Sequence, residues 1–140
     1  MKKGIIAVIL AIALVGGFFL VSKPSSDDTA SNATADSTSV TSFSQVQTAV
    51  ADGGQLLDVR TAEEYSAGHI DGATNFSLQD LQASKLPAGN KDQHIFVYCH
   101  SGNRSGQATT ILKSAGYTNV TDLGAMTHVE SIGGNVVRGT

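Results

Sequence analysis

The chain has 140 residues and a formal net charge of −3, with nine Lys and Arg residues against twelve Asp and Glu. No basic run interleaved with aromatic residues indicates binding to nucleic acid. The single cysteine, Cys99, excludes an intramolecular disulfide, a CxxC redox pair and a cysteine-rich zinc site. We therefore expect a fold without disulfides, and neither a metal nor a cofactor.

The N-terminus carries an apolar segment. After two lysines, residues 4–21 form an uncharged, almost wholly apolar run of about the length that crosses a bilayer as a helix. Those lysines, against Lys23 alone after the run, favour a cytoplasmic N-terminus. Residues 1–22 are thus predicted to be an uncleaved single-pass anchor in the cell membrane, with the body of the chain on the extracytoplasmic side. Secretion after signal cleavage is the alternative, although residues 20–24 make a poor small-x-small cleavage site.

The next segment, residues 23–41, is rich in Ser, Thr, Asp, Asn and Ala and contains almost nothing that builds a core. This composition is typical of a flexible, solvated linker. Residues 42–140 remain for one small domain with a single core.

Helix and strand signals alternate through the first half of this domain. A Glu three residues after Thr61 completes a capping box, and Glu63 and Glu64 are interpreted as a solvated helix start favoured by the helix dipole. The expected elements are a helix from Ser42 or Ser44 to Ala51, a strand at 55–59, a helix begun by Thr61 and closed by Gly68, a turn at 69–73, a strand near 75–76 and a helix at about 78–83.

The second half continues the alternation. We expect a loop at 85–93, a buried strand at 94–98, a helix at 105–115 that ends at Gly116, and a strand at 117–120. Strands alternating with short helices predict an α/β sandwich around a central parallel sheet. In such sheets ligands bind at the carboxyl ends of the strands, which is where Cys99 lies.

The turn after the buried strand is the candidate site. Backbone N–H groups at a strand-to-helix turn have no intrahelical partner, so they attract anions and lower the pKa of a thiol. Arg104 adds a fixed positive charge five positions after Cys99. A lone cysteine at the end of an apolar strand is more often a small buried hydrophobe. The charged loop favours a nucleophilic thiolate that faces an anionic substrate.

Four blocks of sequence together resemble the rhodanese-like sulfurtransferase family. The similarity covers about residues 41–139, and the third block is similar to the family pattern C-x-x-G-x-R-S. The blocks are Leu57-Asp58-Val59-Arg60 with Glu63-Glu64-Tyr65; Gly68-His69-Ile70-Asp71-Gly72-Ala73 with Asn75; Cys99-His100-Ser101-Gly102-Asn103-Arg104-Ser105; and Ala115-Gly116-Tyr117 with Val120 and Leu123-Gly124.

The resemblance implies a three-layer sandwich and a ping-pong transfer of sulfane sulfur through a persulfide on Cys99. A small anionic donor such as thiosulfate or a polysulfide would supply the sulfur, and a thiol or cyanide would accept it. Arg104 would bind an oxyanion donor, and Ser105 is either a further hydrogen-bond donor or only the helix cap. The implied substrate-binding residues are His100, Ser101, Gly102, Asn103, Arg104 and Ser105.

Three further residues of these blocks are assigned to structural support. Asp58 and Arg60 follow another strand and, as in the family's Asp-x-Arg, are expected to bond to neighbouring loops. His69 is also interpreted as structural.

The sequence departs from the family in two places. Many active members carry arginine where this chain has His100, and imidazole is mostly neutral above its pKa of about 6.5, so thiosulfate is expected to be a poor substrate. Ala125 follows Gly124 where a second glycine is usual, and Val129 stands where the family has tryptophan. The last helix is therefore expected to pack differently.

Two other functions use the same fold. Phosphatase and arsenate-reductase loops have five residues between Cys and Arg, whereas this chain has four, which suits a single sulfur atom better than a phosphate. The remaining alternative is a non-catalytic, membrane-tethered module that senses sulfane sulfur or binds a protein.

Overall fold

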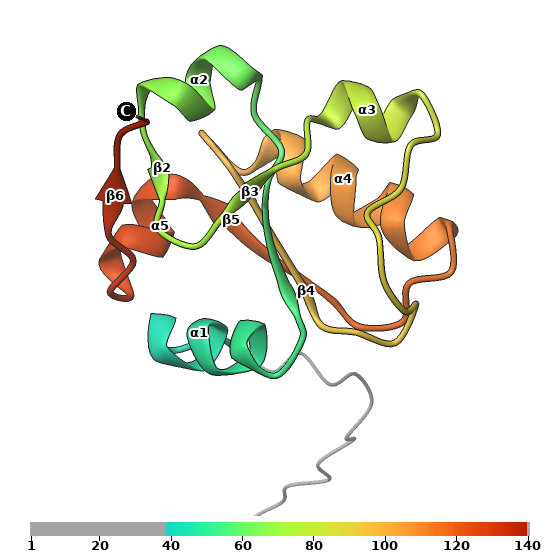
Figure 1. Cartoon of the computed structure of the whole chain (residues 1–140), viewed down its shortest axis with the longest axis horizontal. Coiled ribbons are helices and arrows are strands. Elements are labelled where there is room, and N and C mark those ends of the chain that lie inside the picture. Colours follow the sequence, from blue (N-terminus) through green and yellow to red (C-terminus); the bar gives the residue numbers. More distant parts are fainter. Residues whose placement is uncertain (1–38, 140) are drawn as a thin grey trace, which may run out of the picture. The chain divides into compact units, whose positions relative to one another are not determined.

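The computed structural model describes residues 39–139, and its central element is a four-stranded parallel sheet (Figure 1). The strand order is β3-β1-β4-β5, so β4 pairs with a neighbour on each side. All five of its residues are buried because helices cover both faces of the sheet. The predicted central parallel sheet is confirmed. Its strands are β1 (Gln55–Asp58), β3 (Thr74–Asn75), β4 (Ile95–Cys99) and β5 (Val120–Ala125).

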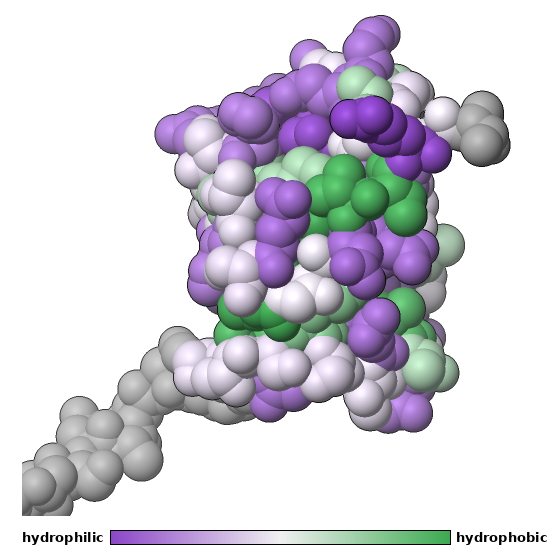
Figure 2. Space-filling view, turned by 90° about the vertical axis from the view of Figure 1, so that its left-hand side faces the viewer, coloured by the Kyte–Doolittle hydropathy of each residue, from purple (hydrophilic) through white to green (hydrophobic). Residues whose placement is uncertain are grey.

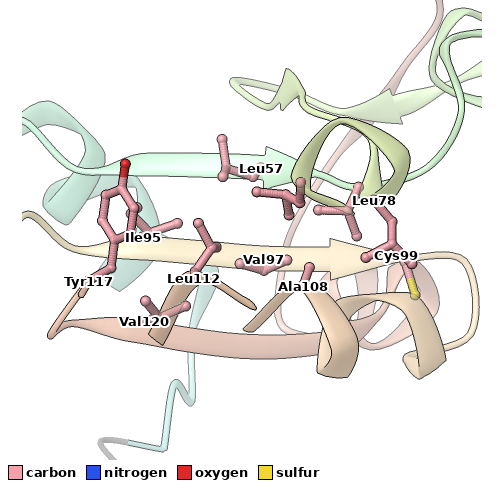
Figure 3. Close-up of a cluster of buried hydrophobic side chains, with 11 residues drawn as sticks. Leu57, Leu78, Ile95, Val97, Cys99, Ala108, Leu112, Tyr117 and Val120 are labelled. Carbon is pink, nitrogen blue, oxygen red and sulfur yellow. The ribbon is translucent and has the colours of Figure 1, made fainter. Parts of the chain in front are cut away.

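Side chains of β4 alternate between the two faces of the sheet. Ile95, Val97 and Cys99 belong to one buried cluster (Figure 3), whereas Phe96 and Tyr98 belong to another. Helices cover both faces, as predicted for a three-layer sandwich. The first cluster lies against α3 (Leu78–Gln82) and α4 (Asn103–Ser114), and the second against α1 (Phe43–Ala51) and α5 (Met126–Ser131).

The first helices begin at side-chain caps. Ser42, not Ser44, caps α1 and forms a capping box with Gln45. Thr61 caps α2 (Ala62–Ala67) and forms the predicted box with Glu64, whose carboxylate accepts from the Thr61 N–H. These local contacts satisfy backbone donors at the helix starts, which is why short sequence signals locate them.

A second, two-stranded sheet was not expected. β2 (His69–Ile70) pairs antiparallel with β6 (Val136–Val137), so the predicted turn at 69–73 is wrong for its first two residues. The partner strand lies far along the chain and gives no local signal. Figure 2 shows the side of the molecule on which β6 lies, where apolar side chains gather among hydrophilic ones. Val136 of β6 is 41% exposed.

Two predicted boundaries are also wrong. Helix α4 begins at Asn103 rather than Ser105, and Gly102 in the left-handed region precedes it without a side-chain cap. The last sheet strand runs from 120 to 125 rather than 117 to 120. Gly124 has a φ of +74° and lies beside a shift in the register between β4 and β5, so the strand continues through an irregularity at this glycine.

No helix within residues 39–139 is long and apolar enough to span a membrane. The anchor predicted at 1–22, and all of the predicted linker except residues 39–41, lie outside the described residues.

A buried polar network fixes the end of β1 against its neighbours. The Asp58 carboxylate is fully buried and accepts hydrogen bonds from the Arg60 side chain at 2.6–3.1 Å and from the Tyr98 hydroxyl at 2.7 Å. Arg60 also donates to the carbonyl of Gly68 at 2.6 Å, and the Ile70 N–H donates to the Tyr98 oxygen. Burial, and then the hydrogen bond to Asp58, raises the pKa of Tyr98 far above its usual value, so the hydroxyl remains a donor.

We expect Tyr98→Phe to lower the free energy of unfolding by about 2–3 kcal/mol, because a buried carboxylate loses a donor and the Ile70 N–H loses its acceptor. Tyr117→Phe is the matched control. Its hydroxyl donates only to the Pro87 carbonyl, so a loss of about 1 kcal/mol is expected. Urea unfolding checks both variants, and equal losses would contradict the importance of the Asp58 network.

Candidate active site

Cys99 is the last residue of β4 and lies between β1 and β5 at the carboxyl edge of the sheet. The residue is fully buried at the end of the first core cluster, and Figure 3 places its sulfur at the tip of the strand, at the end of the row of apolar side chains. The prediction that Cys99 stands at a strand-to-helix turn is confirmed, since only three residues separate β4 from α4.

The backbone between β4 and α4 wraps around the sulfur. The N–H of Gly102 donates to Sγ of Cys99 at 3.0 Å. Gly102 has a φ of +93°, a conformation that residues with a side chain rarely adopt. This glycine lets the loop reverse direction with its N–H directed back at the thiol.

Opposing effects act on the Cys99 thiol, and their net result is a lowered pKa. Burial is the largest effect and raises the pKa, but hydrogen bonds from the backbone N–H groups of Ser105, Gly102 and Ser101 and from the Ser105 hydroxyl outweigh it. All of these donors favour the thiolate. The loop therefore increases the fraction of Cys99 present as the nucleophilic form at neutral pH.

The predicted substrate-binding residues fall into separate groups. Ser101, Gly102 and Ser105 direct backbone N–H groups at the sulfur, and the hydroxyl of the buried Ser105 donates to the Gly102 carbonyl at 2.9 Å. Ser105 is not the helix cap, since it lies within α4. His100 and Asn103 are exposed, and the Asn103 side chain accepts from Gln107 at 2.8 Å.

Arg104 forms an ion pair with Glu64, a contact that the sequence did not predict. Its Nη1 and Nη2 atoms donate to Oε2 and Oε1 of Glu64 at 2.6 and 2.8 Å. Glu64 lies in the first turn of α2 and is 35% exposed, as expected for a solvated helix start, but its pairing with Arg104 was not predicted. The two partners are forty positions apart, and no local pattern links them.

The three residues assigned to structural support lie beside the site rather than at the sulfur. Asp58 and Arg60 form the buried pair described above. The ring of His69 stacks on Tyr65 with 3.7 Å between centroids, and its Nδ1 lies 2.9 Å from the Tyr65 carbonyl oxygen. No group of three or more metal-ligating side chains gathers anywhere in residues 39–139.

Comparison with known proteins decides the family. The model of the rhodanese-like domain matches residues 42–126. The chain belongs to the rhodanese-like family. This rhodanese-like chain is 38% identical over 73 residues to the thiosulfate sulfurtransferase PspE of Escherichia coli K12. The match covers 50% of this chain and 68% of that protein. It is 35% identical over 77 residues to the human thiosulfate:glutathione sulfurtransferase, covering 46% and 67% of the two chains.

Solved structures agree with this assignment. A structure described as a rhodanese with anions from E. coli is 35% identical, with a TM-score of 0.51 over 61% of this chain and 99% of that one. The human single-domain sulfurtransferase TSTD1 is 27% identical, with a TM-score of 0.55 over 64% and 93%. The rhodanese-like fold and the sulfurtransferase family are thus established for this domain.

The Glu64–Arg104 pair gives a pH-dependent contribution to stability. The hydrogen bond from Arg104, ahead of the other effects, lowers the pKa of Glu64 from 4.5 to about 2. Because the folded value is the lower one, the stabilisation is fully present above about pH 4.5 and is lost as the pH falls towards 2.

We expect Glu64→Gln to lower the free energy of unfolding by about 1 kcal/mol at pH 7, since the two side chains are 31% and 35% exposed and solvent screens the pair. The difference from wild type should shrink progressively between pH 4.5 and 3. Urea unfolding at pH 7, 5 and 3 measures it. A difference that stays constant over this range would show that the charge of Glu64 is not what stabilises the fold.

Proposed function

We propose that this chain is a sulfurtransferase that moves sulfane sulfur from a donor such as thiosulfate or a polysulfide to a thiophilic acceptor through a persulfide on Cys99. The observation that carries the proposal is the ring of N–H donors around Sγ of Cys99, with the Gly102 N–H at 3.0 Å. The same donors that stabilise a thiolate would stabilise a persulfide anion in its place. Relatives named as thiosulfate sulfurtransferases support the proposed chemistry.

The reaction has two steps that balance in atoms and charge. The Cys99 thiolate attacks the outer sulfur of the donor, a new S–S bond forms, the donor's S–S bond breaks and its electron pair leaves with the inner sulfur. Thiosulfate would thus release sulfite, and a persulfide R–S–SH would release the thiolate R–S⁻. The acceptor then attacks the outer sulfur of the Cys99 persulfide. Cyanide leaves as thiocyanate, and the electron pair of the broken bond restores the thiolate.

Intact mass of the purified full chain tests this function. Incubation with thiosulfate or a polysulfide is expected to add the mass of one sulfur atom, and cyanide is expected to remove it. Cys99→Ser, which keeps the size and polarity of the side chain, should gain nothing. If no donor adds sulfur to the wild-type chain, catalysis is wrong and the non-catalytic sensing or binding module becomes the function to pursue.

We further propose that residues 1–22 anchor the chain in the cell membrane with the domain on the extracytoplasmic side. The apolar run of residues 4–21, which follows two lysines, supports this orientation. The expected result is a protein that resists carbonate extraction from membranes and whose intact mass includes Met1. A mature N-terminus downstream of residue 22 would instead establish secretion after cleavage.

A further inference from the structure

The ion pair between Arg104 and Glu64 determines how much positive charge the cysteine loop presents. Arg104 follows the loop in the first turn of α4, and Glu64 lies in α2. The two terminal nitrogens of the guanidinium each donate to a different oxygen of the carboxylate, at 2.6 and 2.8 Å. This is the geometry with which arginine also binds a planar oxyanion. An oxyanion donor would therefore have to displace Glu64 to use the same two nitrogens.

The carboxylate of Glu64 is fixed in place before it meets Arg104. Its Oε2 accepts from the Thr61 N–H at 3.1 Å, and its own N–H donates to Oγ1 of Thr61 at 3.3 Å. This capping box anchors the side chain at the start of α2. Displacing Glu64 from Arg104 would leave an oriented carboxylate without its strongest partner, so the pair opposes entry of a competing anion.

The guanidinium of Arg60, just after the end of β1, is also neutralised. Arg60 donates to Asp58 through Nε and Nη2, and Nη2 also donates to the Gly68 carbonyl. The side chains of this pair are almost completely buried. The two arginines are thus each matched by a carboxylate.

This arrangement bears on the class of sulfur donor. Thiosulfate is a dianion whose charge is shared between its outer sulfur and three sulfonate oxygens, so uncompensated cations near the thiolate would favour its approach. The sulfane-sulfur end of a persulfide or a polysulfide has no sulfonate oxygens, and each terminal sulfur carries at most one charge. We infer that Glu64 is a specificity-determining residue that, by holding Arg104, makes this site select persulfide and polysulfide donors over thiosulfate. The inference rests on the proposed sulfur transfer through Cys99.

The test compares two donors on the full chain in single-turnover experiments. Thiosulfate and the persulfide of 2-mercaptoethanol, which has no carboxylate, are each mixed with the protein, and the second-order rate constant for persulfide formation on Cys99 is measured by intact mass. Glu64→Gln keeps the shape and the capping oxygen but removes the charge. The ratio of the thiosulfate rate constant to that of the alkyl persulfide is expected to rise about tenfold in this variant. A purely structural role of Glu64 would lower both rate constants together and leave the ratio unchanged, which would overturn the inference.

Glu63→Gln is the matched control. It removes the same charge from the adjacent position of the same helix, where the side chain is exposed. The donor ratio of this variant should equal that of the wild type. An equal rise in both variants would mean that net charge alone sets the preference, and the inference would be wrong.

A measurement on the wild-type chain keeps the inference testable if Glu64→Gln does not fold. Sulfate is an unreactive dianion, and up to about 50 mM at constant ionic strength it should not slow sulfur transfer from the persulfide of 2-mercaptoethanol. Inhibition at low millimolar sulfate would show that the loop accepts a dianion with Glu64 in place. Absence of persulfide with either donor would instead refute the proposed function, so the two failures are distinguishable.

Discussion

The carboxylate of Asp58 is the constraint on which the geometry of the site depends. It binds the Arg60 side chain and the Tyr98 hydroxyl, and through them it is connected to the Gly68 carbonyl and the Ile70 N–H. The buried carboxylate of Asp58 therefore joins the end of β1 to the end of α2, to β2 and to β4. Tyr98 immediately precedes the cysteine in β4, so anchoring its side chain on one face directs the sulfur to the other. A network that lies beside the sulfur without contacting it thus helps to position the nucleophile.

Local signals could predict much of the fold, and non-local pairing explains what they miss. Ser42 and Thr61 are followed by residues that complete capping boxes, so the helix starts could be read from a few neighbouring positions. The strand predicted at 117–120 is displaced, because pairing with β4 extends β5 from Val120 through Gly124 to Ala125. Strand β6 is two residues long and exists through its partner alone. Sequence reasoning found the cysteine loop because its donors are adjacent in the chain, but it could not pair Arg104 with Glu64 because folding alone brings them together.

The site separates two electrostatic tasks that a cationic loop would combine. Neutral backbone N–H groups around Cys99 stabilise negative charge on sulfur at short range. The guanidinium of Arg104 is paired with Glu64, so it contributes less to the electrostatic potential at longer distances than an unpaired arginine would. Stabilisation of the nucleophile therefore does not require attraction of every anion, which is a physical basis for discrimination among donors that deliver the same atom.

The complete burial of Cys99 has a kinetic consequence. A sulfur that does not contact solvent meets a reagent only when the polypeptide around it moves aside, so each encounter includes an opening event. Such gating limits the rate at which hydrogen peroxide and bulky electrophiles, as well as donors, react with Cys99. These reagents compete for the same open state in proportion to their concentration and reactivity. Burial of this kind would slow overoxidation of a single, unpaired thiol by shortening the time for which it is exposed, without lowering its intrinsic reactivity.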